Sequence, residues 1–191
     1  MTESKKLLNN HPVLDKGNVA LLSSSNGGRA LSDIQSMFLD NSVDLELLRI
    51  ANATFVIKMP LFVQLHMSKY NLVLIQSHRL KKIETYVPNV AEIGGNSVKD
   101  AAEIHDYMKQ TADAMTLNTK GLTMAGCDEF IAQTQTPISV YNELIVHGSL
   151  HEWLKFIKQK NLPKSIESFR YTIEEILKAD WPNINQLKKM A

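Results

Sequence analysis

Cysteine is nearly absent from the sequence, which contains a single one, Cys127, among 191 residues. One thiol excludes an internal disulfide and a cysteine-based zinc cluster, because both need more than one. Long apolar runs are missing too, since no stretch approaches the roughly 18 residues that a membrane-spanning helix needs. The first residues are polar, with no apolar signal core behind them. The sequence therefore predicts a cytoplasmic protein without a membrane partner.

A surplus of charge of either sign is also missing. Lysine and arginine number 21 against 20 aspartates and glutamates, which leaves a net charge of +1. This balance provides no basic footprint, so we expect no nucleic-acid partner. What the sequence does have is apolar material, 44% of its residues, which is enough to fill the core of one domain.

Hydrophobic periodicity predicts a single α+β domain over residues 13–191, preceded by a frayed polar segment over residues 1–12. Ser97 and Ser165 stand where each can cap the helix that follows it. Helices dominate the predicted fold, with a small sheet among them. The strands are expected at 13–22, 53–57 and 80–87, and the helices at 33–39, 45–51, 61–75, 97–117, 128–135, 150–160 and 165–179.

Two patterns suggest sites that their contexts do not support. The pair Gly27-Gly28 lacks the Gly-Lys-Ser/Thr ending of a phosphate loop, so an ordinary turn is favoured. His147 and His151 have the i, i+4 spacing of two metal ligands on one helix face. Gly148, however, is expected at the start of the helix, which places His147 in a turn. The sequence therefore predicts no metal site.

A small polar and cationic segment, Ser77-His78-Arg79, lies between apolar stretches. An arginine fork beside a hydroxyl is a good phosphate ligand, although a solvated loop explains the same residues equally well. The lysines at 155, 158 and 160 form a basic helix end, which is typical of a compensated helix dipole. Residue types alone thus indicate an α+β domain that binds a small phosphorylated ligand.

Several segments, in unbroken order over about residues 13–180, resemble one enzyme family. Residues 56–64 (VIKMPLFVQ) are similar to the pattern hVKAPIFVaRQ, and residues 131–143 (IAQTQTPISVYNE) to xARxxLPxxxYTE. Residues 148–157 (GSLHEWLKFI) are similar to GSLRxWxHF, the form found in phage and bacterial relatives. The family is that of the flavin-dependent thymidylate synthases, and the last segment points to a phage-like member.

The chain departs from this family where the family places its charges. Lys69-Tyr70-Asn71 stand in place of an Arg-His-Arg signature, and Gln133, His151 and Lys160 each stand in place of an arginine. A buried anion without paired donors costs several kcal/mol, which is why such sites are lined with arginine forks. The phosphate element Ser-x-Arg has a counterpart in Ser77-His78-Arg79. The resemblance therefore implies a rebuilt flavin site beside a retained nucleotide element.

By resemblance, each matching position has an expected role. Ser77 and His66 are expected to be catalytic. The nucleotide-binding set is Arg79, Ser77, Gln133, His151 and Lys160, and the cofactor-binding set is Lys69, Tyr70, Asn71 and Ser149.

Two functions from different classes follow from the resemblance. The first is transfer of a one-carbon unit, methyl or hydroxymethyl, to C5 of a pyrimidine nucleoside monophosphate (dUMP or dCMP) within a homotetramer. The family implies FAD, NADPH and methylene-tetrahydrofolate, but the lost arginines argue against FAD in this chain. The second is a non-catalytic homologue that keeps the fold and binds a nucleotide or a protein partner.

Overall fold

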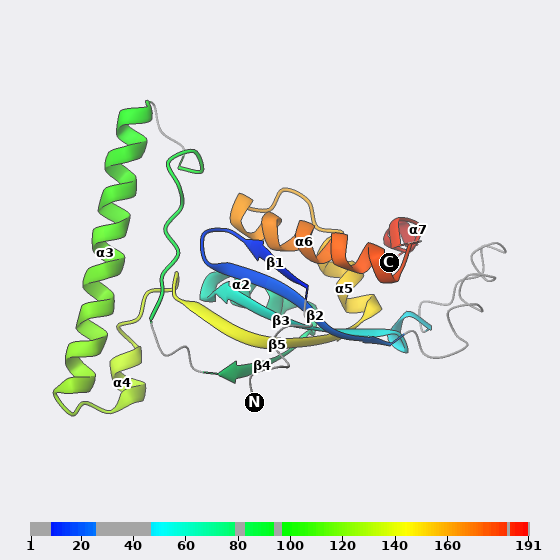
Figure 1. Ribbon diagram of the computed structural model, residues 1–191, viewed down its shortest axis with the longest axis horizontal. Helices are drawn as coiled ribbons and strands as arrows, with labels where there is room; N and C mark the ends of the chain where they lie inside the picture. The colour runs from blue at the N-terminus through cyan, green and yellow to red at the C-terminus, as the bar shows by residue number, and fades with distance from the viewer. Residues whose placement is uncertain (1–8, 26–46, 79–82, 94–96, 183, 191) are drawn as a thin grey trace. The chain divides into compact units, whose positions relative to one another are not determined.

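The computed structural model describes residues 9–25, 47–78, 83–93, 97–182 and 184–190 (Figure 1). The predicted helix at 33–39, the Gly27-Gly28 turn and Arg79 lie outside the described residues. The chain divides into two compact units. The first comprises residues 1–59, 63–79 and 143–191, and the second comprises residues 60–62 and 80–142.

A five-stranded antiparallel sheet, ordered β1-β2-β3-β5-β4, forms the centre of the first unit. The central strands alternate buried and more exposed residues, the pattern of a sheet that packs one face against a core. The α+β architecture expected from the sequence is thereby confirmed. The strands are β1 (Asn10–Val13), β2 (Gly17–Ser25), β3 (Asn52–Pro60), β4 (Val73–His78) and β5 (Tyr141–Ser149).

The first predicted strand is in fact two strands joined by a tight turn. Leu14 adopts a left-handed φ of 58° in this turn. A Cβ on Gly17 would lie 2.6 Å from the carbonyl oxygen of Val13 and 2.9 Å from that of Lys58, so only glycine fits there. Because β1 begins at Asn10, residues 10–12 pair with β2, and the prediction that they are frayed is wrong.

Helices α5 (Leu150–Ile157), α6 (Lys164–Asp180) and α7 (Ile184–Met190) cover the core of this unit (Figure 1). Trp153 is fully buried, its ring centroid 4.9 Å from that of Phe55 on β3. Its indole nitrogen donates to the carbonyl oxygen of Ala53 at 3.1 Å, so α5 is attached to the sheet by packing and by a hydrogen bond. Helix α6 begins at Lys164 after Pro163, so the expected cap at Ser165 is wrong.

The predicted helix over 61–75 ends early. Helix α2 (Leu61–Met67) continues into a 3-10 turn, η3 (Ser68–Tyr70), and then stops at Asn71, whose φ is 56°. From Val73 onward the chain is strand β4, because its backbone pairs with β5 from His147 to Glu143. Local periodicity favoured helix here, and pairing with a strand some seventy residues later overrides it.

The second unit contains α3 (Val98–Met124) and α4 (Glu129–Gln133). Ser97 caps α3 as predicted, its hydroxyl accepting from the backbone N–H of Asp100 at 3.1 Å. The strand expected at 80–87 is reduced, within its described part, to one bridge between Thr85 and Val140. Among the described residues, none of the helices is both long and apolar enough to cross a membrane.

Candidate functional site

Strand β4 carries an irregularity at the segment that sequence analysis assigned to a phosphate. Gln76 pairs with Leu144 and His78 pairs with Glu143, so Ser77 has no opposite residue and is the extra residue of a β-bulge. Bulges bend a strand, re-aim a side chain and are frequent next to active sites. The backbone thus singles out Ser77 within the sheet, immediately before the point at which β4 ends.

A hydrogen-bonded pair of aromatic side chains lies ahead of β4. His66 on α2 and Tyr70 on η3 are four residues apart, and Nε2 of His66 is 3.3 Å from the hydroxyl of Tyr70. Both residues are half-buried. The buried ring of Phe156 on α5 contacts both edge-on, with centroids 5.5 Å from Tyr70 and 6.5 Å from His66. Phe156 therefore restricts the orientation of the pair.

The surroundings keep both members of this pair neutral. Burial lowers the pKa of His66 from its ordinary 6.5, and the charge of nearby Lys69 lowers it further. Burial raises the pKa of Tyr70 from its ordinary 10.0. A neutral imidazole carries one proton, and its position on Nδ1 or Nε2 determines which of the two groups donates across this contact.

The predicted cofactor residues Lys69 and Asn71 flank Tyr70 and are exposed. Lys69 is the one cation among the three residues at the signature position, and the left-handed Asn71 ends the turn. A dinucleotide pyrophosphate carries two charges, and one exposed lysine beside a neutral pair does not supply the paired forks that such a group needs.

The N-terminus of α5 uses its predicted site residues for the fold. Ser149 is the N-cap, and its hydroxyl accepts from the backbone N–H of Glu152 at 3.4 Å. The Glu152 carboxylate accepts in return from the backbone N–H of Ser149 at 2.9 Å and from the Ser149 hydroxyl, completing a capping box. His151 is buried at this helix start, with 7% of its surface exposed. The capping box between Ser149 and Glu152 therefore fixes the start of α5 at the end of β5.

His147 is on strand β5, not in the turn that the sequence predicted. It pairs with Val73 on β4, and its Nδ1 lies 2.8 Å from the hydroxyl of Thr54 on β3. His147 and His151 therefore belong to different elements. Across the part of the chain that the structure describes, no group of three or more His, Cys, Asp or Glu side chains is placed to hold a metal ion.

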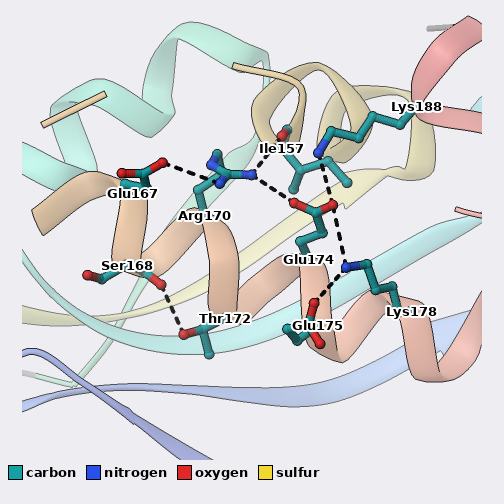
Figure 2. Close-up of polar contacts among 9 residues, drawn as sticks. All are labelled: Ile157, Glu167, Ser168, Arg170, Thr172, Glu174, Glu175, Lys178 and Lys188. Atoms are coloured by element: carbon teal, nitrogen blue, oxygen red, sulfur yellow. Dashed lines mark hydrogen bonds and ion pairs between the residues drawn. The ribbon is translucent and has the colours of Figure 1, made fainter. Parts of the chain in front are cut away.

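A charged cluster on α6 is a second polar feature of this unit (Figure 2). Glu174 is 6% exposed and accepts from Arg170 at 2.7 Å and from Lys188 of α7 at 2.9 Å. Arg170 also donates to the carbonyl oxygen of Ile157, at the end of α5, at 3.2 Å. Burial alone would raise the pKa of Glu174, but the bond from Lys188 and the charges of Lys178 and Arg170 hold it below its ordinary 4.5. The cluster ties three helices together.

The structure brings some predicted site residues together and separates others. The end of α2 and the turn η3, which leads into β4 and Ser77, carry four of them in close succession: His66, Lys69, Tyr70 and Asn71. Gln133 is exposed and belongs to the other unit, and Lys160 is exposed in the connection after α5. Sequence reasoning missed the contact between His66 and Tyr70, although their i, i+4 spacing signals it. It also missed Phe156 and the bulge, which only the packing of α5 and the pairing with β5 reveal.

Comparison with known proteins identifies the fold. No protein-family model matches the sequence, and no curated protein matches it significantly. Among solved structures, this chain is similar to PolB from Streptomyces cacaoi, a UMP/dUMP methylase, bound with 5-Br UMP. The TM-score is 0.74 and the sequence identity is 14%, over 88% of this chain and 92% of that one. The same enzyme bound with 5-Br dUMP is similar with a TM-score of 0.75 and 14% identity, over 90% and 93% of the two chains.

Proposed function

We propose that this chain transfers a one-carbon unit, methyl or hydroxymethyl, to C5 of a pyrimidine nucleoside monophosphate. The observation that carries the proposal is the likeness of its fold, over 88% of its length, to a methylase whose substrates are UMP and dUMP. The resemblance of its segments to flavin-dependent thymidylate synthases, found independently in the sequence, supports the same reaction class. The β-bulge at Ser77 supports a functional role for the strand end that carries the phosphate element.

In this proposal the phosphate is bound by Arg79 and by the hydroxyl of Ser77. Lys160, an exposed cation, supplies further charge, and His151 contributes as the family equivalent of an arginine. Ser77 and His66 take part in the chemistry. Because the pattern resembles that of tetrameric enzymes, we propose an assembly of four 21.5 kDa chains.

The proposed one-carbon donor is methylene-tetrahydrofolate, and we propose that FAD binds weakly or not at all. Lys69, Tyr70 and Asn71 offer a single positive charge where a dinucleotide needs several. Hydroxymethyl transfer needs no reductant, so it is the version of the reaction that these residues favour. A preparation of the protein that retains stoichiometric FAD through purification contradicts this part of the proposal.

The nucleotide site is tested by calorimetric titration of UMP, dUMP and dCMP into the protein and its Arg79→Ala variant. Hydrogen bonds to charged groups contribute about 1.5–3 kcal/mol, so the variant is expected to bind roughly 10- to 150-fold more weakly. Lys120→Ala, which removes one exposed cation from α3, serves as the control and is expected to bind as the wild type does. Absence of binding of all three nucleotides to the wild type rules out the proposed site.

A second candidate, the non-catalytic nucleotide-binding homologue, is favoured by one observation. Ser149 and His151, which stand at positions that the resemblance marks as functional, are used as a helix cap and as a buried residue. The two candidates differ in turnover. Nucleotide that binds but is recovered unchanged after incubation with methylene-tetrahydrofolate supports the binding protein, and a new C5-substituted product detected by mass spectrometry supports the enzyme.

A further inference from the structure

We propose that Tyr70 and His66 form a proton-transfer pair in which the Tyr70 hydroxyl exchanges a proton with the nucleotide and His66 takes up the proton that Tyr70 gives. This inference rests on the proposed function and assigns the acid–base groups of the same site. It gives Tyr70, which stands where the family has a charged signature residue, a role in proton transfer in place of cofactor binding.

The geometry carries the inference. The Tyr70 oxygen and Nε2 of His66 are 3.3 Å apart, slightly beyond the roughly 2.6–3.2 Å at which hydrogen-bonded acid–base groups exchange a proton. Apo geometry of this kind is often slightly long and shortens when a ligand binds. Phe156 is fully buried and meets both rings edge-on, so neither ring turns away without disturbing the packing of α5. The pair is therefore pre-oriented by the core.

The electrostatics suit the same role. The pKa of His66 is lowered by burial and by Lys69, so at neutral pH its imidazole is neutral and able to accept a proton. Tyr70, whose pKa is raised by burial, keeps its own proton until a base takes it. Lys69 is the charged neighbour on η3, and Phe156, the contact from α5, is apolar. A phenol that transfers its proton to a neighbouring base as it accepts another stays neutral throughout, which avoids a half-buried phenolate.

The proposed step is balanced in atoms and electrons. C5 of the nucleotide attacks the methylene carbon of the iminium form of methylene-tetrahydrofolate, and the C=N π electron pair passes to the donor nitrogen. The proton on C5 then leaves to the oxygen of Tyr70 while the phenolic proton of Tyr70 passes to Nε2 of His66. The C5–H electron pair restores the double bond between C5 and C6. The imidazolium of His66 returns its proton to water.

The test follows tritium release from dUMP labelled at C5, with methylene-tetrahydrofolate as donor, in the wild type and in Tyr70→Phe. General acid–base groups contribute roughly 10²- to 10⁴-fold, so the variant is expected to release tritium slower by that factor. The dUMP dissociation constant, measured by calorimetry, is expected to change by about tenfold at most, since one neutral hydrogen bond is at stake. Tyr171→Phe removes the hydroxyl of an exposed tyrosine on α6 and is the matched control.

Nitrogen NMR of the labelled histidine provides a readout that does not depend on turnover. In the wild type, His66 is expected as the neutral tautomer with its proton on Nδ1, and in Tyr70→Phe the Nε2 resonance is expected to shift as the donor disappears. Tritium release at the wild-type rate in Tyr70→Phe, with dUMP still bound, overturns the proton-transfer pair and leaves the proposed function standing. Binding of dUMP without any release by the wild type overturns the pair as well. Failure of the wild type to bind dUMP overturns the proposed function itself.

Discussion

The first unit contains two partly buried polar clusters, the Glu174 cluster and the His66–Tyr70 pair, and they differ in charge. Glu174 is 6% exposed and ionised, and cations from its own helix and from α7 surround it. His66 and Tyr70 are half-buried and neutral, and they bond to each other. Charge is retained in the first case because Arg170 and Lys188 bond directly to the carboxylate. It is avoided in the second because burial disfavours the charged form of both groups, and the charge of Lys69 adds to this effect on His66.

This difference separates a structural cluster from a reactive one. In the Glu174 cluster, Arg170 reaches the end of α5 and Lys188 reaches from α7, so these two cations hold helices together (Figure 2). The neutral pair connects a turn to Phe156, and burial shifts the pKa of each of its two titratable groups toward the neutral form. Perturbed groups of the second kind are the ones that serve in acid–base chemistry.

The largest expected effect comes from breaking the charged cluster. Glu174→Ala leaves Arg170 and Lys188 without their buried counter-charge, and removing one partner of a buried pair costs about 3–5 kcal/mol. We expect a loss of that size in the free energy of unfolding, measured by urea denaturation. Glu175→Ala removes the neighbouring carboxylate, whose side chain is 46% exposed, and is expected to cost less than about 1 kcal/mol. Equal losses in the two variants contradict the contrast.

Acid is expected to weaken the same cluster. The folded-state pKa of Glu174 lies below its ordinary 4.5, so the stabilisation by its charge is complete above 4.5 and is lost as the pH falls through the folded-state pKa. Glu174→Gln has no carboxylate to protonate. The difference in unfolding free energy between the wild type and this variant should therefore shrink as the pH is lowered below 4.5, and a constant difference shows that the charge is not responsible.

The neutral pair should contribute much less to stability. Tyr70→Phe removes one hydrogen bond between neutral groups and keeps the ring against Phe156, so we expect a loss of about 0.5–1.5 kcal/mol by urea denaturation. Tyr171→Phe, on the exposed face of α6, is expected to be neutral within a few tenths of a kcal/mol. A loss above about 3 kcal/mol in Tyr70→Phe places the pair with the structural cluster.

The smallest expected effect is a change in the pKa of His66 when the charge of Lys69 is removed. Lys69 lowers the pKa of His66, so Lys69→Met should raise that pKa toward 6.5. Because Lys69 is exposed, the rise should be small and should vanish in high salt, where surface charges are screened. Proton NMR titration of His66 measures it. The contribution of His66 to the free energy of unfolding is complete above pH 6.5 and falls as the pH drops through the folded-state pKa. In Lys69→Met the folded-state pKa lies closer to 6.5, so the loss of stability should be smaller. An unchanged pKa at low salt shows that burial alone keeps His66 neutral.

Local patterns were most informative where the chain interacts with its near neighbours. The Ser97 cap and the helix that follows it were predictable, because capping is decided within four residues. The helix at α5 was also predictable from its spacing, and its N-cap at Ser149 follows the same local rule. By contrast, the predicted helix over 61–75 failed after Tyr70, because the choice between helix and strand there depends on β5.

The candidate site also contains features that were predictable from the sequence and features that depend on distant segments. Residue types singled out Ser77 beside an arginine, because a hydroxyl and a guanidinium carry phosphate-binding chemistry by themselves. The resemblance to a family added His66 and Tyr70. The bulge at Ser77 was not predictable, since it exists only in the register between β4 and β5. The structural use of Ser149 and His151 was hidden as well, because a residue type does not reveal whether it faces a ligand or closes a helix end.

By itself, the sequence determined the α+β composition and the amphipathic helices. These are properties of short segments and of residue chemistry, and they persist in any arrangement of the elements. Only the tertiary structure decided that Glu174 is buried among cations from two helices, that Phe156 orients His66 and Tyr70, and that Ser77 is the extra residue of a bulge. Each of these depends on contacts between segments far apart in the chain, and the free energy of such contacts is set by packing and by dielectric surroundings that no local pattern records.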